Sequence, residues 1–265
     1  MNRIAIYLLT LFNDITMQHL RNFWAFIISN LIWFAEKVTF YPKLRLAYKT
    51  LYKCQVNGKI EGEFIVFDVG SNKGQSINFF RDLFPRVKIY AFEPSKKTFT
   101  KLERRIKKRR QKNVFLFQFG LGEFPGEFDF YESILDETST FALPKEDSRY
   151  LNMKNKILFQ KNKEGYKKTL CRIETLDNFI QEYEINHIDI LKIDVEGFEY
   201  EVLRGGNIAL QEKKINIVQF ERHTDDMRED NFVAINDFLK VRGYLRVTAI
   251  QHLSGNFFEM LYQRT

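Results

Sequence analysis

The sequence predicts a doubly wound α/β fold, in which a mostly parallel sheet is covered by helices on both faces. From residue 64 onward, short runs rich in Val, Ile and Phe alternate with amphipathic stretches. The first of these runs ends in a glycine turn at Gly70 and Gly74. The composition is that of a globular protein, with 45% hydrophobic and 28% charged residues and only five Pro, which excludes a disordered chain.

The first part of this alternation predicts three strands and two helices. We expect a buried strand at 64–70 (FIVFDVG) and a helix with 3.6-residue periodicity at 76–84 (SINFFRDLF). A second strand follows at 88–94 (KIYAFEP), where Pro94 ends it, and then a basic helix. The third strand is expected at 113–122 (NVFLFQFGLG).

The second part continues the same pattern to the end of the chain. Thr175 is the expected N-cap of the next helix, because its hydroxyl can accept from a free amide of the first turn. The expected elements are a helix at 175–183, a strand at 187–195, a helix near 198–204, a strand at 216–222, a helix at 232–244 and two strands at 245–250 and 256–264. Ligands of such a fold are expected at the carboxyl ends of the parallel strands.

The N-terminal region differs from the rest because it carries two apolar runs, at 4–12 and 23–34. Neither run reaches the roughly 20 apolar residues that a membrane-spanning helix needs. Two interpretations remain open. The runs form short helices that cap the main domain, or they lie on a membrane surface with Trp24 and Trp33 at headgroup depth.

We therefore divide the chain into an N-terminal apolar helical segment, 1–52, and a catalytic domain, 53–265. The two cysteines, Cys54 and Cys171, form no disulfide or metal-ligand pattern, which is typical of a reducing compartment. We expect a cytoplasmic protein, with peripheral association at the inner face of the membrane as the alternative.

The net charge of +7 is concentrated in one stretch. Residues 96–112 hold ten Lys or Arg and one Glu, a sum of +9, so the remainder sums to −2. Such a stripe can bind phosphates of RNA, lipid headgroups or an anionic glycan. Phe99, Leu102 and Ile106 recur at helical spacing beneath the charges, which favours a solvated helix face instead.

The first crossover and the second strand indicate the cofactor. Gly70 and Gly74 permit a tight turn, but their spacing is not the G-x-G-x-x-G of dinucleotide binders. Glu93 ends the second strand, where a carboxylate can accept hydrogen bonds from both ribose hydroxyls. Asp68 would repel a pyrophosphate and suits an ammonium group. These charges favour S-adenosylmethionine over NAD.

Several segments together resemble the FkbM-type family of S-adenosylmethionine-dependent methyltransferases. The resemblance covers about residues 60–265 and is carried by FDVGSNKGQS, YAFEPS, TLDNF, LKIDVEGFEYEVLRGG and QFERH. It implies the seven-stranded sheet of class I methyltransferases and O-methylation of a hydroxyl on a sugar or a natural product. We expect a small-molecule or glycan acceptor.

The resemblance also implies site residues. The cofactor-binding set is Asp68, Gly70, Asn72, Gly74, Ser76, Glu93, Pro94, Gln118 and Gly120. Gln118 and Gly120 stand where the family more often has Asn and Ala. Within residues 136–143 (DETSTFAL), Ser139 and Thr140 are the counterparts of paired serines over the substrate. The segment 123–170 and the N-terminal helices are expected to shape the acceptor pocket.

Candidate catalytic residues lie where the fourth and fifth strands end: Asp194, Glu196, Glu221 and His223. Asp194 and Glu221 can orient acceptor hydroxyls and the cofactor's amino group, and His223 can serve as the general base. Alternatively, Asp194, Glu221 and His223 hold a divalent ion.

Simpler interpretations exist for these residues. His223 can be a surface histidine in a polar run, and Glu196 can be the cap or first-turn acid of the following helix. Glu199 and Glu201 are expected on the solvent face of that helix.

Other functions compete with the O-methyltransferase. An RNA methyltransferase would use the basic helix at 96–112, but a helix after the second strand runs away from the active-site mouth, so nucleic acid is not the expected partner. A non-catalytic, membrane-associated module with this fold is the third hypothesis. An NAD-dependent oxidoreductase is disfavoured by the glycine spacing.

Overall fold

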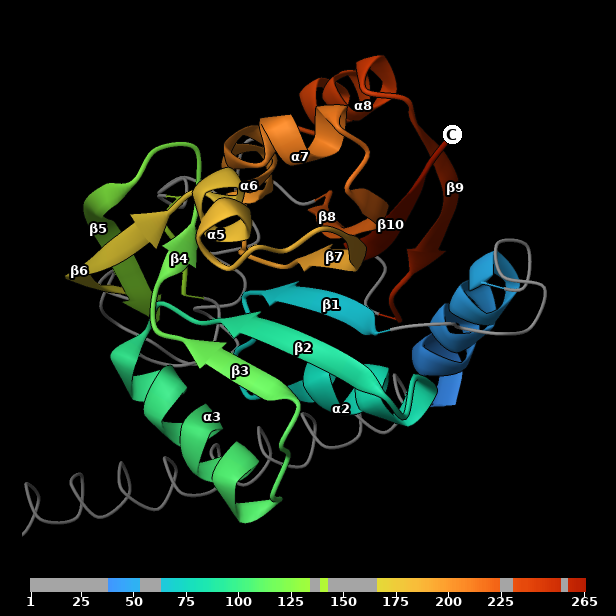
Figure 1. The fold of residues 1–265 in the computed structure, drawn as a ribbon. Coiled ribbons are helices and arrows are strands. Elements are labelled where there is room, and N and C mark those ends of the chain that lie inside the picture. The colour runs from blue at the N-terminus through green and yellow to red at the C-terminus, as the bar shows by residue number, and fades with distance from the viewer. Residues whose placement is uncertain (1–37, 53–62, 134–138, 143–165, 225–230, 254–256) are drawn as a thin grey trace, which may run out of the picture.

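A computed structural model describes residues 38–52, 63–133, 139–142, 166–224, 231–253 and 257–265. A seven-stranded sheet with the order β3-β2-β1-β7-β8-β10-β9 forms its centre (Figure 1). β10 runs antiparallel to both of its neighbours, and every other neighbouring pair is parallel. The prediction of a seven-stranded, mostly parallel sheet is therefore confirmed.

The strands of this sheet are β1 (Phe64–Val69), β2 (Val87–Phe92), β3 (Val114–Phe117), β7 (Ile188–Ile193), β8 (Ile215–His223), β9 (Tyr244–Gln251) and β10 (Phe257–Arg264). β1 and β7 lie side by side in the middle and are buried at every residue. Strands covered on both faces have no solvent side, which is why their sequences are nearly continuous apolar runs.

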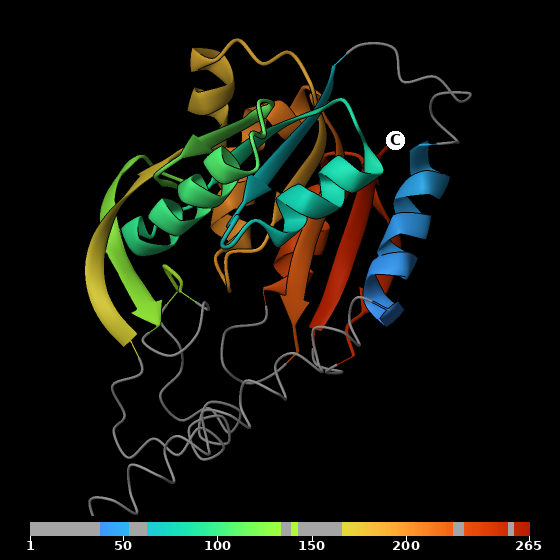
Figure 2. The same ribbon diagram turned by 90° about the horizontal axis from the view of Figure 1, so that it is seen from below.

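Helices cover both faces of the sheet (Figures 1 and 2). One face carries α2 (Gln75–Leu83), α3 (Lys96–Lys108) and a helix over residues 38–52. The other face carries α5 (Leu176–Glu182), α6 (Glu199–Gly205), α7 (Asn207–Gln211) and α8 (Phe232–Val241). The predicted N-cap of α5 is confirmed, because the Thr175 hydroxyl accepts from the Asn178 amide at 3.1 Å.

The helix over 38–52 packs on the sheet through residues spaced four apart. Phe40, Leu44, Tyr48 and Tyr52 are all buried and join a core cluster that includes Phe64. The C-terminal part of the segment 1–52 thus shares a hydrophobic core with the domain. The apolar runs at 4–12 and 23–34 lie outside the described residues, so their two interpretations, and the division at residue 52, stay predictions.

Among the described residues, no helix has the length and the apolar composition needed to cross a membrane.

The predicted third strand is wrong in extent. It divides into β3 and β4 (Gly120–Leu121), and β4 leaves the main sheet. With β5 (Gly126–Ser133) and β6 (Tyr166–Glu174), β4 forms a second, three-stranded sheet in the order β4-β6-β5. We did not predict β5 and β6, whose sequences mix polar with apolar residues because much of this hairpin is exposed. The short helix α7 was also not predicted.

Candidate active site

The turn after β1 requires glycine at position 70. Gly70 has φ +79°, and a Cβ added to it would lie 1.8 Å from the carbonyl oxygen of Asp194. The amides of Gly70 and Ser71 both donate to the Phe92 carbonyl at 3.0 Å. The turn is therefore held against the ends of both neighbouring strands, β2 and β7, and no L side chain fits between them.

Glu93 lies beside this turn, at the end of β2, and is 6% exposed. Its carboxylate accepts from the backbone amides of Asn72 and Ser95, each at 2.9 Å. Burial raises the pKa of Glu93 to about 7, against these two hydrogen bonds, which lower it. A carboxylate with free lone pairs at this place can accept further hydrogen bonds from a ligand.

A first pocket opens at these carboxyl ends. Its lining includes these residues expected from the sequence: Gly70, Asn72, Glu93, Pro94, Gly120, Ser139, Asp194 and Glu196. Gln118 is exposed and is not part of this lining. Thr140 is 1% exposed, and its hydroxyl donates to the Glu196 carbonyl at 2.8 Å. Ser139, and not Thr140, is therefore the member of that pair that faces the pocket.

The residues of the first pocket fit S-adenosylmethionine. Glu93 is a buried carboxylate placed to accept from ribose hydroxyls, and the Gly70 turn lets a ligand approach the backbone closely. Among the described lining residues, the charged side chains are Glu93, Asp194 and Glu196, which suits a ligand with a sulfonium and an ammonium group and opposes one with a pyrophosphate.

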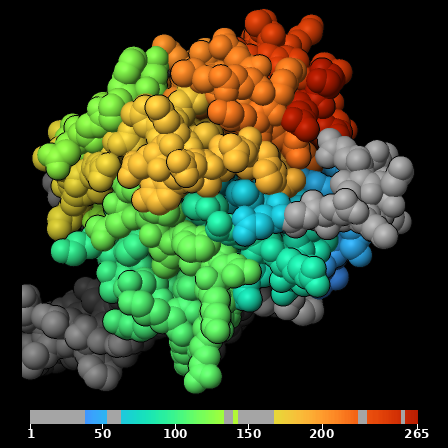
Figure 3. Space-filling view, in the orientation of Figure 1, coloured from blue at the N-terminus to red at the C-terminus, as the bar shows by residue number. Residues whose placement is uncertain are grey.

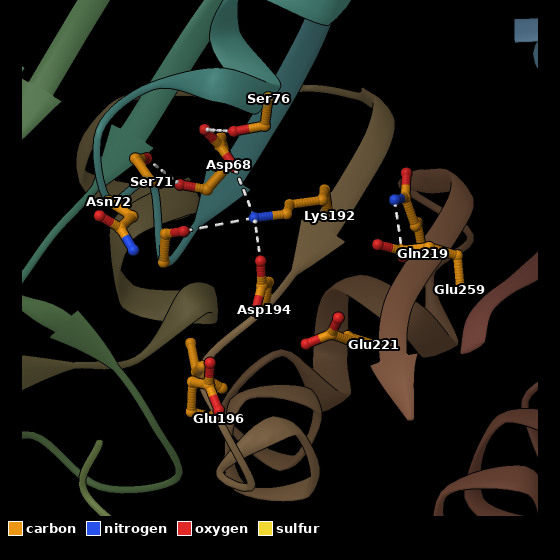
Figure 4. Close-up of polar contacts among 12 residues, drawn as sticks. Asp68, Ser71, Asn72, Ser76, Lys192, Asp194, Glu196, Gln219, Glu221 and Glu259 are labelled. Atoms are coloured by element: carbon orange, nitrogen blue, oxygen red, sulfur yellow. Dashed lines mark hydrogen bonds and ion pairs between the residues drawn. The ribbon is translucent and has the colours of Figure 1, made fainter. Parts of the chain in front are cut away.

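Lys192 joins the residues around the turn into one ionic cluster (Figure 4). Its Nζ lies 3.2 Å from Asp68 Oδ1, 3.2 Å from Asp194 Oδ2 and 3.3 Å from the Gly70 carbonyl. Burial acts to lower the pKa of Lys192, but the charges of Asp194 and Asp68 outweigh it and raise the pKa above the usual lysine value. Lys192 is therefore a buried cation paired with two carboxylates.

Within this cluster, Asp68 and Asp194 have different roles. Asp68 is fully buried, and its second oxygen accepts from the Ser76 hydroxyl at 2.6 Å. Asp68 lines neither of the two pockets described here, whereas Asp194 is 36% exposed and lines both. Asp194 is thus the acid that a ligand can reach, and Asp68 supports it through Lys192.

Lys192 was missed at the sequence level, although a signal was present. It lies between Leu191 and Ile193 in a strand that is buried throughout. A charge in such a place needs a partner, and residues two apart on a strand share a face, so Asp194 was the local candidate. Removing one partner of a buried ion pair typically costs about 3–5 kcal/mol.

A second pocket lies on the α2 side of the same turn and shares Gly70, Asn72 and Asp194 with the first. Its remaining lining combines aromatic and polar residues. The aromatic residues are Phe40, Tyr41, Phe79 and Phe80, and the polar ones include Ser76, Lys192, Gln219, Glu221, His252 and Glu259. The shared residues make this junction the place where ligands of the two pockets would meet.

Glu221 and His223 form a close pair at the end of β8. His223 Nε2 lies 2.9 Å from Glu221 Oε2 and 3.8 Å from Glu196 Oε2. The His223 side chain is 10% exposed, so its interpretation as a surface histidine is wrong. Burial, and next the charge of Asp194, raise the pKa of Glu221 above the usual carboxylate range, against the hydrogen bond from His223.

Among the described residues, two groups that share Glu221 have ligand atoms close enough for a divalent ion. One is Glu196, Glu221 and His223, and the other is Glu221, His252 and Glu259, with all atoms of a group within 4.8 Å of one another. Asp194, which we expected in such a set, belongs to neither group, and its carboxylate pairs with Lys192.

The predictions for the glutamates that follow β7 are wrong in two respects: the exposure of Glu199 and Glu201, and the place of Glu196. Glu199 is 7% exposed rather than solvent-facing, and it accepts from the amides of Gly197 at 3.0 Å and Val195 at 3.3 Å. Glu201 is also partly buried. The N-cap of α6 is Phe198, so Glu196 precedes the helix, with φ +60°, and lines the first pocket.

Comparison with known proteins gives the family. Residues 68–246 match the methyltransferase FkbM domain. The chain is 26% identical over 156 residues to Methyltransferase 1 of Beauveria bassiana, covering 58% of this chain and 62% of that protein. It is 27% identical over 165 residues to Hexuronic acid methyltransferase AglP of Haloferax volcanii, covering 62% and 59%. The chain therefore spans less than two thirds of the length of these two relatives.

Solved structures with a similar fold include the METTL16 MTase domain, with a TM-score of 0.49, 10% identity and coverage of 84% of this chain and 68% of that one. Another is precorrin-6y C5,15-methyltransferase of Geobacter metallireducens, with a TM-score of 0.44, 12% identity and coverage of 84% and 88%. Since the family match covers more than half of the 265 residues, this chain belongs to the FkbM family of S-adenosylmethionine-dependent methyltransferases.

Proposed function

We propose that this chain transfers a methyl group from S-adenosylmethionine to a hydroxyl oxygen of a sugar or natural-product acceptor. The observation that carries the proposal is Glu221, which lines the second pocket near its junction with the first. Glu221 is 15% exposed, its carboxylate lies 2.9 Å from His223 Nε2, and its pKa is raised. A base with these properties suits the removal of a proton from an alcohol near neutral pH.

One relative supports a sugar acceptor. It is named for the methylation of a hexuronic acid, which carries several hydroxyls. The aromatic and polar composition of the second pocket is also compatible with a small polar ring, since such sites combine apolar walls with a few placed polar groups.

The mechanism assigns each residue a separate task. When bound, S-adenosylmethionine supplies a methyl group on a positively charged sulfur. Glu93 and the Gly70 turn hold the cofactor, and Asp194, fixed by Lys192, orients the groups at the junction of the pockets. Alignment of this kind can contribute about 7–11 kcal/mol.

The Glu221–His223 pair removes the proton from the acceptor hydroxyl. With the cofactor bound, the Glu221 carboxylate would take the proton of the acceptor hydroxyl. The acceptor oxygen would form its bond to the methyl carbon while the carbon–sulfur bond breaks and S-adenosylhomocysteine leaves. His223 Nε2, 2.9 Å from Glu221, keeps that carboxylate in place and, through its proximity, can relay the proton onward. Base catalysis of this type contributes about 10²–10⁴-fold to the rate.

A divalent ion is the alternative for the same residues, because a metal would lower the pKa of an acceptor hydroxyl. Under that alternative, Glu196, Glu221 and His223 are ligands rather than a base and its partner. Dialysis against EDTA distinguishes the two. Base catalysis predicts unchanged transfer, whereas a metal mechanism predicts loss of transfer and its return with added Mg²⁺.

The test is methyl transfer from S-adenosylmethionine with a labelled methyl group to fractions of a cell extract. We expect Glu221→Gln to reduce transfer by about 10²–10⁴-fold and to leave calorimetric affinity for the cofactor nearly unchanged. Glu212→Gln is the matched control, since Glu212 is half exposed and pairs only with Lys214 in the described contacts.

The product identifies the atom that is methylated. An ether on a hydroxyl resists mild alkali, whereas a methyl ester is hydrolysed. Full activity of Glu221→Gln, or a label that alkali releases, contradicts the proposal.

A further inference from the structure

Half of the aromatic residues of the second pocket lie outside the region that matches the family. Phe40 and Tyr41 belong to the helix over 38–52, whereas the match begins at residue 68. The Tyr41 ring lies 5.5 Å from the Phe79 ring of α2, and Phe40 stacks on His252 at 3.9 Å between centroids. This wall is therefore built from contacts between residues far apart in the sequence.

The floor of the pocket is a fixed set of hydrogen-bonding groups. Gln219 donates from Nε2 to Glu259 Oε2 at 2.8 Å, and the buried Tyr48 hydroxyl donates to Gln219 Oε1. These contacts set the orientation of the Gln219 amide. Glu221 lies two residues further along the same strand, and its carboxylate is turned toward Asp194 (Figure 4). Carboxylates only accept hydrogen bonds, so this floor favours a ligand rich in hydroxyl donors.

The charges of the pocket oppose an acidic ligand. Its described carboxylates are Asp194, Glu221 and Glu259, with Asp68 directly behind, against Lys192 and His252 as cationic groups. Even with His252 protonated, three carboxylates line the pocket against two cationic groups, and Lys192 is already paired with Asp68 and Asp194. An added carboxylate would therefore be repelled. The raised pKa of Glu221, caused in part by Asp194, is consistent with this field.

From the wall, the floor and the charges together, we propose that the second pocket binds the acceptor as a non-acidic sugar ring, uncharged or bearing an amine. The ring's apolar face packs on Tyr41 and Phe79, and its hydroxyls donate to Glu221 and Glu259. A uronic acid ring is excluded, which distinguishes this chain from the relative named for hexuronic acid. This inference rests on the proposed function, because it names the substrate class of that site.

The test measures binding without turnover. Saturation-transfer NMR is recorded on the full chain with S-adenosylhomocysteine bound and with methyl glycosides of the gluco, galacto and manno series, each as the neutral sugar, the amino sugar and the uronic acid. In at least one series, we expect a saturation-transfer signal from the neutral or amino sugar. The signal from the uronic acid should be at least about tenfold weaker, because its carboxylate is repelled by the carboxylates of the pocket.

Variants connect the signal to the pocket. Tyr41→Ala is expected to reduce the signal several-fold, while Phe124→Ala, which changes a 62% exposed ring outside the pocket, leaves it unchanged. Glu259→Gln is expected to raise the uronide signal relative to the neutral ring, which a merely structural role would not do. Unchanged affinity for S-adenosylhomocysteine shows that each variant is folded.

Three outcomes overturn the inference: stronger binding of the uronides, no binding in any series, or signals that survive Tyr41→Ala. These outcomes are distinct from failure of the proposed function. If the neutral ring binds but no hydroxyl is methylated in the extract assay, the proposed function fails and the binding specificity stands.

Discussion

Glu93 shows how one buried carboxylate connects the fold to cofactor binding. The residue follows β2 and accepts from the amides of Asn72 and Ser95, and the charges of Asp68 and Lys192 also act on its pKa. Burial raises its pKa to about 7. A raised pKa means that the folded chain holds this proton better than the unfolded chain. Its contribution to stability is therefore complete below about pH 4.5 and is lost as the pH rises to about 7.

Cofactor affinity should instead increase as the pH rises, because ribose hydroxyls donate to the ionised form of the Glu93 carboxylate. We expect the affinity for S-adenosylhomocysteine to fall about tenfold for each pH unit below 7 and to be nearly constant above about pH 8. Isothermal calorimetry between pH 5.5 and 8.5 (roughly 1.5 units on either side of that pKa) measures this. The Glu93→Gln variant should bind S-adenosylhomocysteine weakly, with an affinity that does not change with pH. Glu127 is exposed, so Glu127→Gln should show the pH dependence of the wild type. A flat wild-type profile would refute the assignment.

Among the elements, α3 carries the charge of the molecule but not its active site. All ten Lys and Arg of residues 96–112 are exposed, while Leu102 and Ile106 are buried beneath them. Thr98, near the start of the helix, lines the first pocket. The helix then runs away from the pocket, and its surface forms the lower edge of the molecule in Figure 3. Arg105 donates to the Lys73 carbonyl at 2.6 Å, which ties α3 to the turn before α2.

We expect the triple change Lys101→Gln, Arg104→Gln and Lys108→Gln to alter cofactor affinity and methyl transfer to a small acceptor by less than about twofold, because exposed charges far from a site are screened. Calorimetry and the labelled-methyl assay measure both quantities.

The same variant examines the RNA alternative. If wild-type protein methylates RNA and the triple variant does not, α3 is a nucleic-acid surface and the small-molecule proposal is wrong. A gel shift that weakens with salt and survives the triple change would place RNA elsewhere on the molecule.

At the scale of the whole molecule, the helix over 38–52 is joined to the rest of the fold by buried, long-range contacts. Tyr48 is fully buried, and its hydroxyl donates to Gln219, which lies 171 residues further along the chain. Tyr52 donates to the Asp189 carbonyl at 3.1 Å. These contacts connect an N-terminal helix to β7 and β8, the two strands whose ends carry Asp194 and Glu221.

We predict that Tyr48→Phe lowers the free energy of unfolding by about 1–3 kcal/mol, because Gln219 is then left with a buried, unsatisfied amide oxygen. Urea denaturation followed by circular dichroism measures the change. Tyr183→Phe is the control, since that side chain is 44% exposed and should change stability by less than about 0.5 kcal/mol. Equal stability of the two variants would show that the Tyr48 hydrogen bond contributes nothing.

Much of the fold was predictable because its signals are local. β1, β2, β7 and α5 lie within about two residues of their predicted bounds, since continuous apolar runs and a threonine cap act over a few neighbouring residues. The glycine turn and Glu93 were likewise found from their places at the ends of strands. β5 and β6 were missed because partly exposed strands lack the continuous apolar run that identified the others.

The sequence alone thus determined the class of fold, the family resemblance and the cofactor turn. Only the tertiary structure decided that Lys192 joins Asp68 to Asp194, that Glu199 supports the turn after β7, and that Gln219, Glu221 and Glu259 face an aromatic wall from residues 38–52. Periodicity and turn chemistry depend on neighbours along the chain. Ion pairs and pockets depend on which distant strands become neighbours. Glu259 lies opposite Glu221 because β10, the last strand of the chain, is inserted between β8 and β9.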